Sequence, residues 1–233
     1  MPRNIVPERG ERAFICGQTG SGKTAFAVWL LGYMPGTLIY DTKEERKFSA
    51  LPKSVRVATM DEARKALREN KGGEAVYDFV ILRPSVAETL DSEMLDTMLQ
   101  YHYENLRGIG AYIDEVFMFH NGGRVGPGLM SLLTRGRSRG ITLTMSAQRP
   151  AWLSRFCLTE SQRFYVFRLV DRADRQRLGE IIPGLSRDEQ PEKYHFQYFD
   201  FDQDGPAYFL PVPLDNPESH GYIDDADDSK TWI

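Results

Sequence analysis

Short continuous runs of hydrophobic residues alternate along this chain with longer segments in which hydrophobic residues recur every three or four positions. The short runs are bounded by turn residues, as in strands buried on both faces of a parallel sheet, whereas the longer spacing is typical of amphipathic helices. The pattern therefore predicts an α/β fold in which helices flank a mostly parallel central sheet. Strands are predicted at 12–16, 37–41, 55–59, 77–82, 111–119, 141–147 and 164–169, and helices after residue 24 and at 60–70, 87–106, 128–136 and 172–182.

The pattern changes after Pro183. Two segments with the alternation of strands, 193–202 and 206–214, are separated by the turn sequence "QDG" and predict an antiparallel pair. We interpret residues 1–214 as a single domain whose last part, from about 193, is this β addition, and residues 215–233 as a C-terminal tail.

Composition fits a globular protein with one core. The chain has 233 residues, of which 41% are hydrophobic and 12% aromatic. Its first residues are polar and lack the features of a signal peptide. The longest apolar stretch, 24–34, has 11 residues, whereas a membrane-spanning helix needs about 20. We therefore expect no transmembrane segment.

The two cysteines, Cys16 and Cys157, show neither a disulfide framework nor the spacing of a zinc site. Cys16 falls within a predicted strand, where a buried reduced thiol is expected. A reducing cytoplasm is therefore the expected compartment.

Acidic residues are concentrated at the C-terminal end of the chain. Residues 215–233 contain six acids and one lysine, a net charge of −5, so the remaining residues carry +1 out of the total of −4. The body of the protein therefore has room for local basic patches. The tail is either a solvated end or a segment that docks a partner.

The sequence "GQTGSGKT" (Gly17–Thr24) matches the phosphate-binding pattern G-x-x-x-x-G-K-[ST], and it lies between a predicted strand and a predicted helix. Its glycines let backbone amides point at the β-phosphate of a nucleotide. Lys23 is expected to neutralise the β- and γ-phosphates, and the Thr24 hydroxyl is expected to ligate Mg²⁺. The predicted nucleotide-binding residues are Gly17, Gln18, Thr19, Gly20, Ser21, Gly22, Lys23 and Thr24.

The predicted strand "GAYIDEVFMF" supplies two adjacent carboxylates. Asp114 would lie at the carboxyl end of the sheet, where it can hold Mg²⁺. Glu115 would lie where an attacking water must be polarised, and a carboxylate there acts as a general base. Motifs that read guanine are absent from the sequence. The Asp-Glu pair therefore favours an ATPase with an additional catalytic glutamate over a nucleotide switch.

A second predicted strand, 141–147, ends at Gln148. An amide at this position can contact both the γ-phosphate and the attacking water, and can thus sense the phosphate. Three arginines precede the strand, namely Arg135, Arg137 and Arg139. They are either a solvated helix end or the source of an arginine finger, which completes the active site of a neighbouring subunit.

The order of these motifs resembles that of the FtsK–HerA superfamily of DNA-translocating ATPases. The resemblance spans roughly residues 12–185, and its segments are "GQTGSGKT", "IYDTKEE", "YIDEV", "GRSRGITLTMSAQRP" and "RFYVFRLVDRADRQRL". It implies a RecA-like P-loop NTPase fold with ATP and Mg²⁺ as cofactors. The compact length resembles the genome-packaging ATPases of tailless, membrane-containing double-jelly-roll viruses and phages.

The resemblance also implies roles for individual residues. Asp114 would be the metal-linked acid, Glu115 the catalytic acid and Gln148 the sensor. The arginine finger matches Arg137 best, with Arg139 as the second candidate. Less specific matches are Arg168 and Arg175, for which ion pairing within the fold is an equal alternative, and Asp41, Glu44 and Glu45, whose "DTKEE" departs from the usual pattern.

The same resemblance implies partners. It predicts a ring of identical subunits, expected to be hexameric, that pumps double-stranded DNA into a preformed capsid in the cytoplasm of a host cell, with capsid vertex proteins and a virion-associated location as further expectations. The glycine-rich loop 119–128 follows Glu115 closely, so its arginine, Arg124, is a candidate contact to DNA phosphates. A flexible surface loop without such a role is the alternative.

Other functions compete with this prediction. One is a cellular DNA translocase of the same superfamily. A second is a small-molecule phosphotransferase in which "TRGRSRG" closes as a lid over the phosphates. A third is a filamentous-phage assembly ATPase, which would need a membrane anchor that this sequence does not show.

Overall fold

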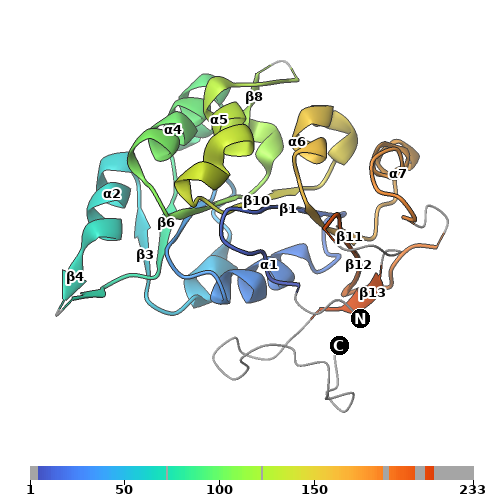
Figure 1. Cartoon of the computed structure of the whole chain (residues 1–233), viewed down its shortest axis with the longest axis horizontal. Coiled ribbons are helices and arrows are strands. Elements are labelled where there is room, and N and C mark those ends of the chain that lie inside the picture. Colours follow the sequence, from blue (N-terminus) through green and yellow to red (C-terminus); the bar gives the residue numbers. More distant parts are fainter. Residues whose placement is uncertain (1–4, 72, 122, 186–188, 203–207, 213–233) are drawn as a thin grey trace, which may run out of the picture.

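A computed structural model describes residues 5–71, 73–121, 123–185, 189–202 and 208–212 (Figure 1). In this part of the chain, nine strands form one sheet in the order β13-β12-β11-β1-β10-β7-β2-β6-β3. They are β1 (Arg12–Cys16), β2 (Thr37–Tyr40), β3 (Ser54–Val57), β6 (Phe79–Leu82), β7 (Gly110–Ile113), β10 (Leu143–Ala147), β11 (Arg163–Phe167), β12 (His195–Asp200) and β13 (Tyr208–Pro211).

Within this sheet, the neighbouring strands β11, β1, β10, β7, β2, β6 and β3 pair in parallel. The strands β12 and β13 add antiparallel at the β11 edge. The predicted α/β class and the predicted C-terminal antiparallel pair are therefore confirmed. The turn "QDG" and the acidic tail lie outside the described residues, so the boundary at residue 214 stays a prediction.

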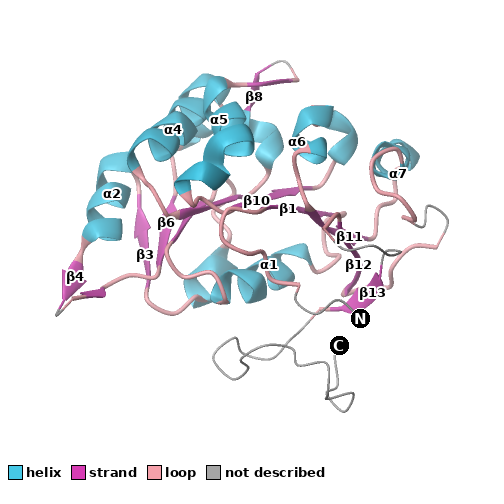
Figure 2. Cartoon of the chain, viewed as in Figure 1, coloured by secondary structure: helices cyan, strands magenta, loops and turns pink. Residues whose placement is uncertain are grey.

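Helices cover both faces of the sheet (Figure 2). The longer helices are α1 (Lys23–Gly32), α2 (Met60–Arg68), α4 (Ser92–Asn105), α5 (Pro127–Arg135) and α7 (Arg172–Gly179). On one face, α1 packs its Phe26 and Leu30 onto Ile15 and Tyr165. On the other face, α2, α4, α5 and α7 pack onto alternate residues of the same strands. Because both faces are buried, the strands read as continuous apolar runs in the sequence.

The strand predicted at 111–119 is shorter than expected. β7 ends at Ile113, and a 3₁₀ turn, Val116–Phe119, follows. Between them Glu115 adopts the left-handed conformation, with φ 59° and ψ 64°. A non-glycine residue in this region cannot continue a strand. The chain therefore turns away from the sheet directly after its two carboxylates.

The helix predicted at 87–106 is two helices, α3 (Val86–Thr89) and α4. The break occurs because Asp91 caps the second helix, accepting hydrogen bonds from the backbone N–H groups of Glu93 and Met94 at 3.0 and 3.1 Å. A short helix that the pattern did not predict, α6 (Arg155–Thr159), follows the sheet strand β10 in the chain.

The segment predicted as a loop at 119–128 contains a small hairpin of β8 (His120–Asn121) and β9 (Arg124–Val125). A second unpredicted hairpin joins β4 (Asn70–Lys71) to β5 (Glu74–Ala75). Both projections are visible at the rim of the molecule in Figure 1. Within the described ranges, no helix combines the length and the apolar character that a membrane span requires.

Candidate nucleotide-binding site

The phosphate loop lies between β1 and α1, at the carboxyl ends of the parallel strands. Two of its glycines are required by its geometry. A Cβ on Gly17 would lie 2.4 Å from the Cβ of Phe167, so no side chain fits there. Gly22 precedes α1 with φ 111°, a conformation that favours glycine. The helix thus starts at the loop and directs its N-terminal N–H groups toward it.

A pocket of about 350 Å³ opens beside this loop. Its lining residues come from the phosphate loop, from the segment after β2, from the ends of β7 and β10, and from the residue before β12. They are Thr19, Gly20, Gly22, Lys23, Thr24, Ala25, Lys43, Glu45, Lys47, Asp114, Glu115, Gln148 and Tyr194. Residues far apart in the sequence therefore converge on one hollow.

Lys23 is held close to the loop, where its ammonium donates a 3.3 Å hydrogen bond to the carbonyl of Gln18. Burial lowers the pKa of Lys23, and Glu115 is the nearby charge that opposes this shift most. A buried ammonium without full compensation attracts an anion strongly. The position is therefore suited to the phosphates of a nucleotide.

Asp114 follows β7 and is held from two sides. The hydroxyl of Ser146, on the neighbouring strand β10, donates to Asp114 Oδ1 at 2.8 Å. The Thr42 hydroxyl donates to the Asp114 backbone carbonyl at 3.1 Å. Burial raises the pKa of Asp114 to about 6, against the stabilising hydrogen bond from Ser146. The ionised form of a carboxylate in this environment is stabilised when a cation binds it.

Glu115 has a different partner on each carboxylate oxygen. Its Oε1 accepts the backbone N–H of Gln148 at 2.9 Å, and its Oε2 pairs with the ammonium of Lys43. The Glu115 backbone N–H donates to Ser146 Oγ at 3.3 Å, which supports its left-handed conformation. The carboxylate is thereby fixed at the wall of the pocket.

Gln148 connects the end of β10 to the phosphate loop. The hydroxyl of Thr19 donates to the Gln148 side-chain oxygen at 2.9 Å. Because β10 lies between β1 and β7, the amide stands between the loop and the two carboxylates. The structure thus places Lys23, Thr24, Asp114, Glu115 and Gln148 around one pocket, and their roles in catalysis stay predictions.

Lys43 was not singled out by the sequence analysis. It belongs to the segment "DTKEE", in which Asp41, Glu44 and Glu45 were the candidates. Asp41 is buried and faces its own loop and Arg83, and Glu44 does not line the pocket. The sequence did offer a signal for Lys43, because it is a lysine three residues after β2, a strand that ends near the phosphate loop.

Arg137 and Arg139 lie at the other end of the sheet. They belong to a 3₁₀ turn, Gly136–Arg139, that precedes β10, and Arg137 packs beside Gly10, which precedes β1. Arg139 stacks on Tyr103 with its guanidinium 4.3 Å from the ring centroid and donates to the Tyr103 carbonyl at 2.8 Å. Neither arginine reaches the pocket of its own chain. Arg137 is the exposed one of the two.

The other predicted arginines have mixed positions. Arg175 donates to the carbonyls of Leu169 and Val170 at 2.9 and 2.7 Å, which is a structural role. Arg168 is exposed beside the phosphate loop, where its carbonyl accepts the Gln18 N–H. Arg124 is exposed on the hairpin β8–β9.

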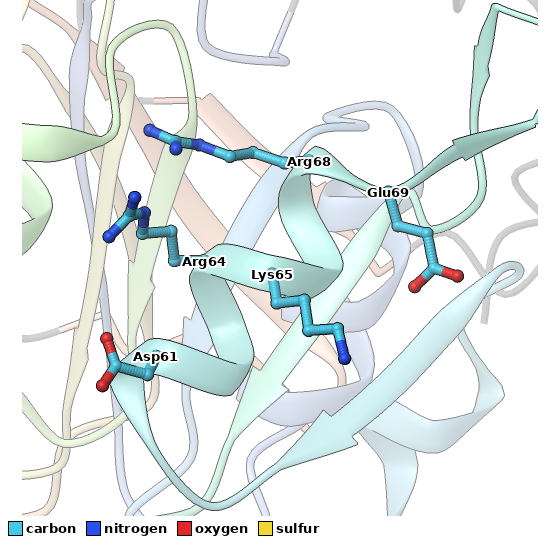
Figure 3. A pocket seen from close by; sticks show the side chains of 5 residues that line it. All are labelled: Asp61, Arg64, Lys65, Arg68 and Glu69. Atoms are coloured by element: carbon cyan, nitrogen blue, oxygen red, sulfur yellow. The ribbon is translucent and has the colours of Figure 1, made fainter.

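A second hollow lies on α2, away from the phosphate loop. Figure 3 shows that its lining side chains come from this helix and its end, Asp61, Arg64, Lys65, Arg68 and Glu69. Three cations and two carboxylates share the surface, so it has no strong charge of one sign. None of the predicted site residues belongs to it.

The oxygens that could hold Mg²⁺ come from Thr24 and Asp114. In the described part of the chain, no group of three His, Cys, Asp or Glu side chains could hold a metal ion. Mg²⁺ needs only one or two protein oxygens, since water and substrate phosphates complete its shell. The Thr24 hydroxyl and the Asp114 carboxylate line the same pocket and provide such oxygens.

No model of a protein family matches this chain. A curated relative, the DNA packaging ATPase P9 of Enterobacteria phage PRD1, is 30% identical over 217 residues, which cover 89% of this chain and 90% of that protein.

Solved structures share its fold. The genome packaging NTPase B204 of Sulfolobus turreted icosahedral virus 2, in complex with ATP-gammaS, aligns with a TM-score of 0.67 at 16% identity and covers 87% of this chain and 98% of that one. The DNA-packaging ATPase B204 of Sulfolobus turreted icosahedral virus aligns with a TM-score of 0.65 at 18% identity, over 88% of this chain and 100% of that one. The RecA-like P-loop architecture is therefore confirmed.

Proposed function

Because this chain belongs to the family of viral DNA packaging ATPases, we propose that it hydrolyses ATP and uses the energy to move double-stranded DNA into a preformed capsid. One observation supports this proposal above the others. A glutamate held in a left-handed turn faces the same pocket as the phosphate loop, together with an aspartate and a sensor amide.

In this proposal the phosphate loop binds the nucleotide. The backbone amides of 17–24 surround the β-phosphate, and Lys23 contacts the β- and γ-phosphates. Thr24 and Asp114 would hold Mg²⁺, which would neutralise charge on the phosphate oxygens. Glu115 and Gln148 remain available for the attacking water.

Hydrolysis follows from the positions of these two side chains. Gln148 orients a water against the γ-phosphorus, and Glu115 accepts one proton of that water. The water oxygen bonds to phosphorus as the bond to the β–γ bridging oxygen breaks, which leaves ADP and phosphate. The proton on Glu115 then passes to solvent, and the carboxylate is restored.

The arginine finger acts between subunits. Arg137 cannot serve its own pocket because β10, five residues or about 17 Å long, separates the two. We assign it to the γ-phosphate of a neighbouring copy in a ring, which we expect to be hexameric. Arg139 is less suited, since its guanidinium is already engaged with Tyr103 and Glu104.

Mixed rings test this assignment. Arg137→Ala chains should bind ATP normally, yet should lower the ATPase rate of mixed rings in proportion to their share, because each leaves one neighbouring pocket without its finger. Removal of a finger costs about 10³ to 10⁵ in rate in related systems. Arg135→Ala is the matched control. An Arg137→Ala ring that hydrolyses ATP at the normal rate contradicts the assignment.

We propose that the hairpin β8–β9 contacts DNA through Arg124. The hairpin is joined to Glu115 only by the turn Val116–Phe119, so a change at the carboxylate can move it. A ring repeats this single cation around the duplex, so that weak contacts add up. Capsid vertex proteins and the host cytoplasm remain the expected partners and place of action.

The phosphotransferase alternative requires "TRGRSRG" to close over the phosphates, but this segment lies at the amino end of β10. The decisive measurement is the ATPase rate of the purified chain with and without duplex DNA. We expect stimulation by DNA in the wild type and none in Glu115→Gln, with Glu74→Gln, on an exposed hairpin, as the control. An ATP turnover rate that does not change when duplex DNA is added, together with a phosphorylated small-molecule product, would overturn the proposal.

A further inference from the structure

The ion pair between Lys43 and Glu115 is the feature of the pocket that the proposed mechanism does not use. Glu115 must accept a proton from water, yet its Oε2 is paired with an ammonium and its Oε1 accepts the Gln148 N–H. Both carboxylate oxygens of Glu115 are therefore engaged by donors, which leaves fewer free lone pairs for an attacking water. Movement of Lys43 away from Oε2 would free that oxygen.

Lys43 is delivered to Glu115 by a loop that is fixed on both sides. Before it, the Thr42 hydroxyl donates to the Asp114 carbonyl at 3.1 Å. After it, the backbone N–H of Glu45 donates to Asp41 Oδ1 at 2.8 Å. The buried Asp41 carboxylate is in turn paired with Arg83, whose Nε lies 2.7 Å from Oδ2. The backbone is held rigidly, so the placement of Lys43 is part of the fold.

The side chain of Lys43 is nevertheless more exposed than that of its partner. It is 42% exposed, whereas the Glu115 side chain is 13% exposed. Lys43 lines the same pocket as Lys23 and Thr24, which belong to the phosphate loop. A terminal phosphate in this pocket carries more negative charge than one carboxylate, so it competes for the ammonium.

We propose that Lys43 exchanges partners when ATP binds. Without nucleotide it holds Glu115 in an engaged state, and with ATP it moves to the γ-phosphate and leaves Oε2 of Glu115 to accept the proton of the attacking water. Lys43 stays protonated throughout, so the proton balance of hydrolysis is unchanged. This inference rests on the proposed ATPase function and adds a residue that responds to the γ-phosphate.

The exchange predicts a specific change in nucleotide preference. Lys43→Met keeps most of the length of the side chain and removes its charge. It should weaken the binding of a non-hydrolysable ATP analogue about tenfold and leave ADP binding unchanged, because ADP lacks the γ-phosphate. Lys43→Arg should restore most of the preference. Lys65→Met is the matched control, since Lys65 is exposed on α2 and does not line this pocket.

A second variant tests the competition itself. In Glu115→Gln the ammonium has lost its anionic partner, so the ATP analogue should bind several-fold more tightly than to the wild type. The double variant Lys43→Met with Glu115→Gln should lose that gain.

Both experiments measure the nucleotide affinity of the full chain by isothermal titration calorimetry. An ATP-to-ADP affinity ratio that is the same in the wild type and in folded Lys43→Met overturns the exchange, even where the wild type hydrolyses ATP. A wild type that does not hydrolyse ATP contradicts the proposed function instead.

Discussion

Ser146 shows how one hydroxyl supports two functional groups. It donates to the Asp114 carboxylate and accepts from the Glu115 N–H. Its donated bond favours the charged form of Asp114, whose pKa burial has raised to about 6. The two carboxylates therefore share one support on the neighbouring strand.

Replacing this hydroxyl should move the pH dependence of the ATPase. Asp114 must be ionised to hold Mg²⁺, so Mg²⁺ binding weakens, and the rate at subsaturating Mg²⁺ falls, as pH drops through about 6. Ser146→Ala removes a bond to the charged form and raises the pKa of Asp114 further. We expect the acidic limb of the pH–rate profile to move up by about one unit, with a higher Mg²⁺ requirement.

Thr144→Val is the control for this change. Thr144 lies on the same strand, and its buried hydroxyl is unpartnered within the described residues. Removing it should leave the acidic limb in place and leave stability equal or higher. An unmoved acidic limb in Ser146→Ala would show that Asp114 is not the titrating group.

At the scale of elements, α4 is docked onto β2 through a buried histidine. His102 contacts the Tyr40 hydroxyl through Nδ1 and the Ile109 carbonyl through Nε2, both at 3.0 Å. A neutral imidazole that accepts from tyrosine and donates to the carbonyl satisfies both contacts. Burial lowers the pKa of His102 to about 4.

This histidine should make the protein less stable in acid. A histidine in the unfolded chain binds its proton near pH 6.5, whereas His102 in the folded chain does so only near pH 4. The unfolded state thus binds more protons between these values, and the free energy of unfolding falls by roughly 3 kcal/mol as pH drops through the window. Urea denaturation of His102→Gln should show a smaller dependence on pH. Asn105→Ala, in the same helix, keeps the histidine and should keep the wild-type slope.

The contact between α4 and α5 leaves no room for a side chain at Gly128. Its backbone N–H donates to Asp96 Oδ2 at 2.8 Å, and a Cβ would lie 2.2 Å from the Asp96 carbonyl oxygen. Gly128→Ala should therefore reduce the free energy of unfolding by about 3 kcal/mol. Ser131→Ala, one turn further along α5, should change it by less than about 0.5 kcal/mol. A tolerated alanine at 128 would show that the two helices can separate without cost.

Sequence patterns predicted the elements that are determined by residues close to them in the sequence. The phosphate loop depends on its own glycines, and the parallel strands are buried on both faces, so their apolar runs are visible. The end of β7 was missed because Glu115 is turned by contacts with Ser146 and Gln148, residues more than thirty positions away. Lys43 was missed for the same reason, since Asp41 and Arg83 fix its loop across 42 positions.

At the scale of the whole molecule, one short segment connects the pocket to the hairpin β8–β9. It begins at Glu115, which lines the pocket, and continues through the turn Val116–Phe119 into the hairpin. If Arg124 contacts DNA phosphates, each subunit of a ring adds one releasable counterion to binding. Arg124→Ala should lower the slope of log affinity against log salt concentration by about one for each subunit in contact, across all DNA sequences. The check is fluorescence anisotropy of duplex DNA at several salt concentrations. Arg56→Ala, an exposed cation on β3 at the far edge of the sheet, is the control.

The strand β10 ends at Gln148, and the turn that carries Arg137 precedes it. If Arg137 serves the adjacent copy, this strand joins the phosphate sensor of one chain to the guanidinium that activates the next. A parallel strand in the middle of a packed sheet is stiff, so a displacement at one end is passed to the other. Nucleotide sites around the ring would then hydrolyse ATP in succession rather than at random. The amino-to-carboxyl direction of β10 would set the order in which neighbouring subunits hydrolyse ATP.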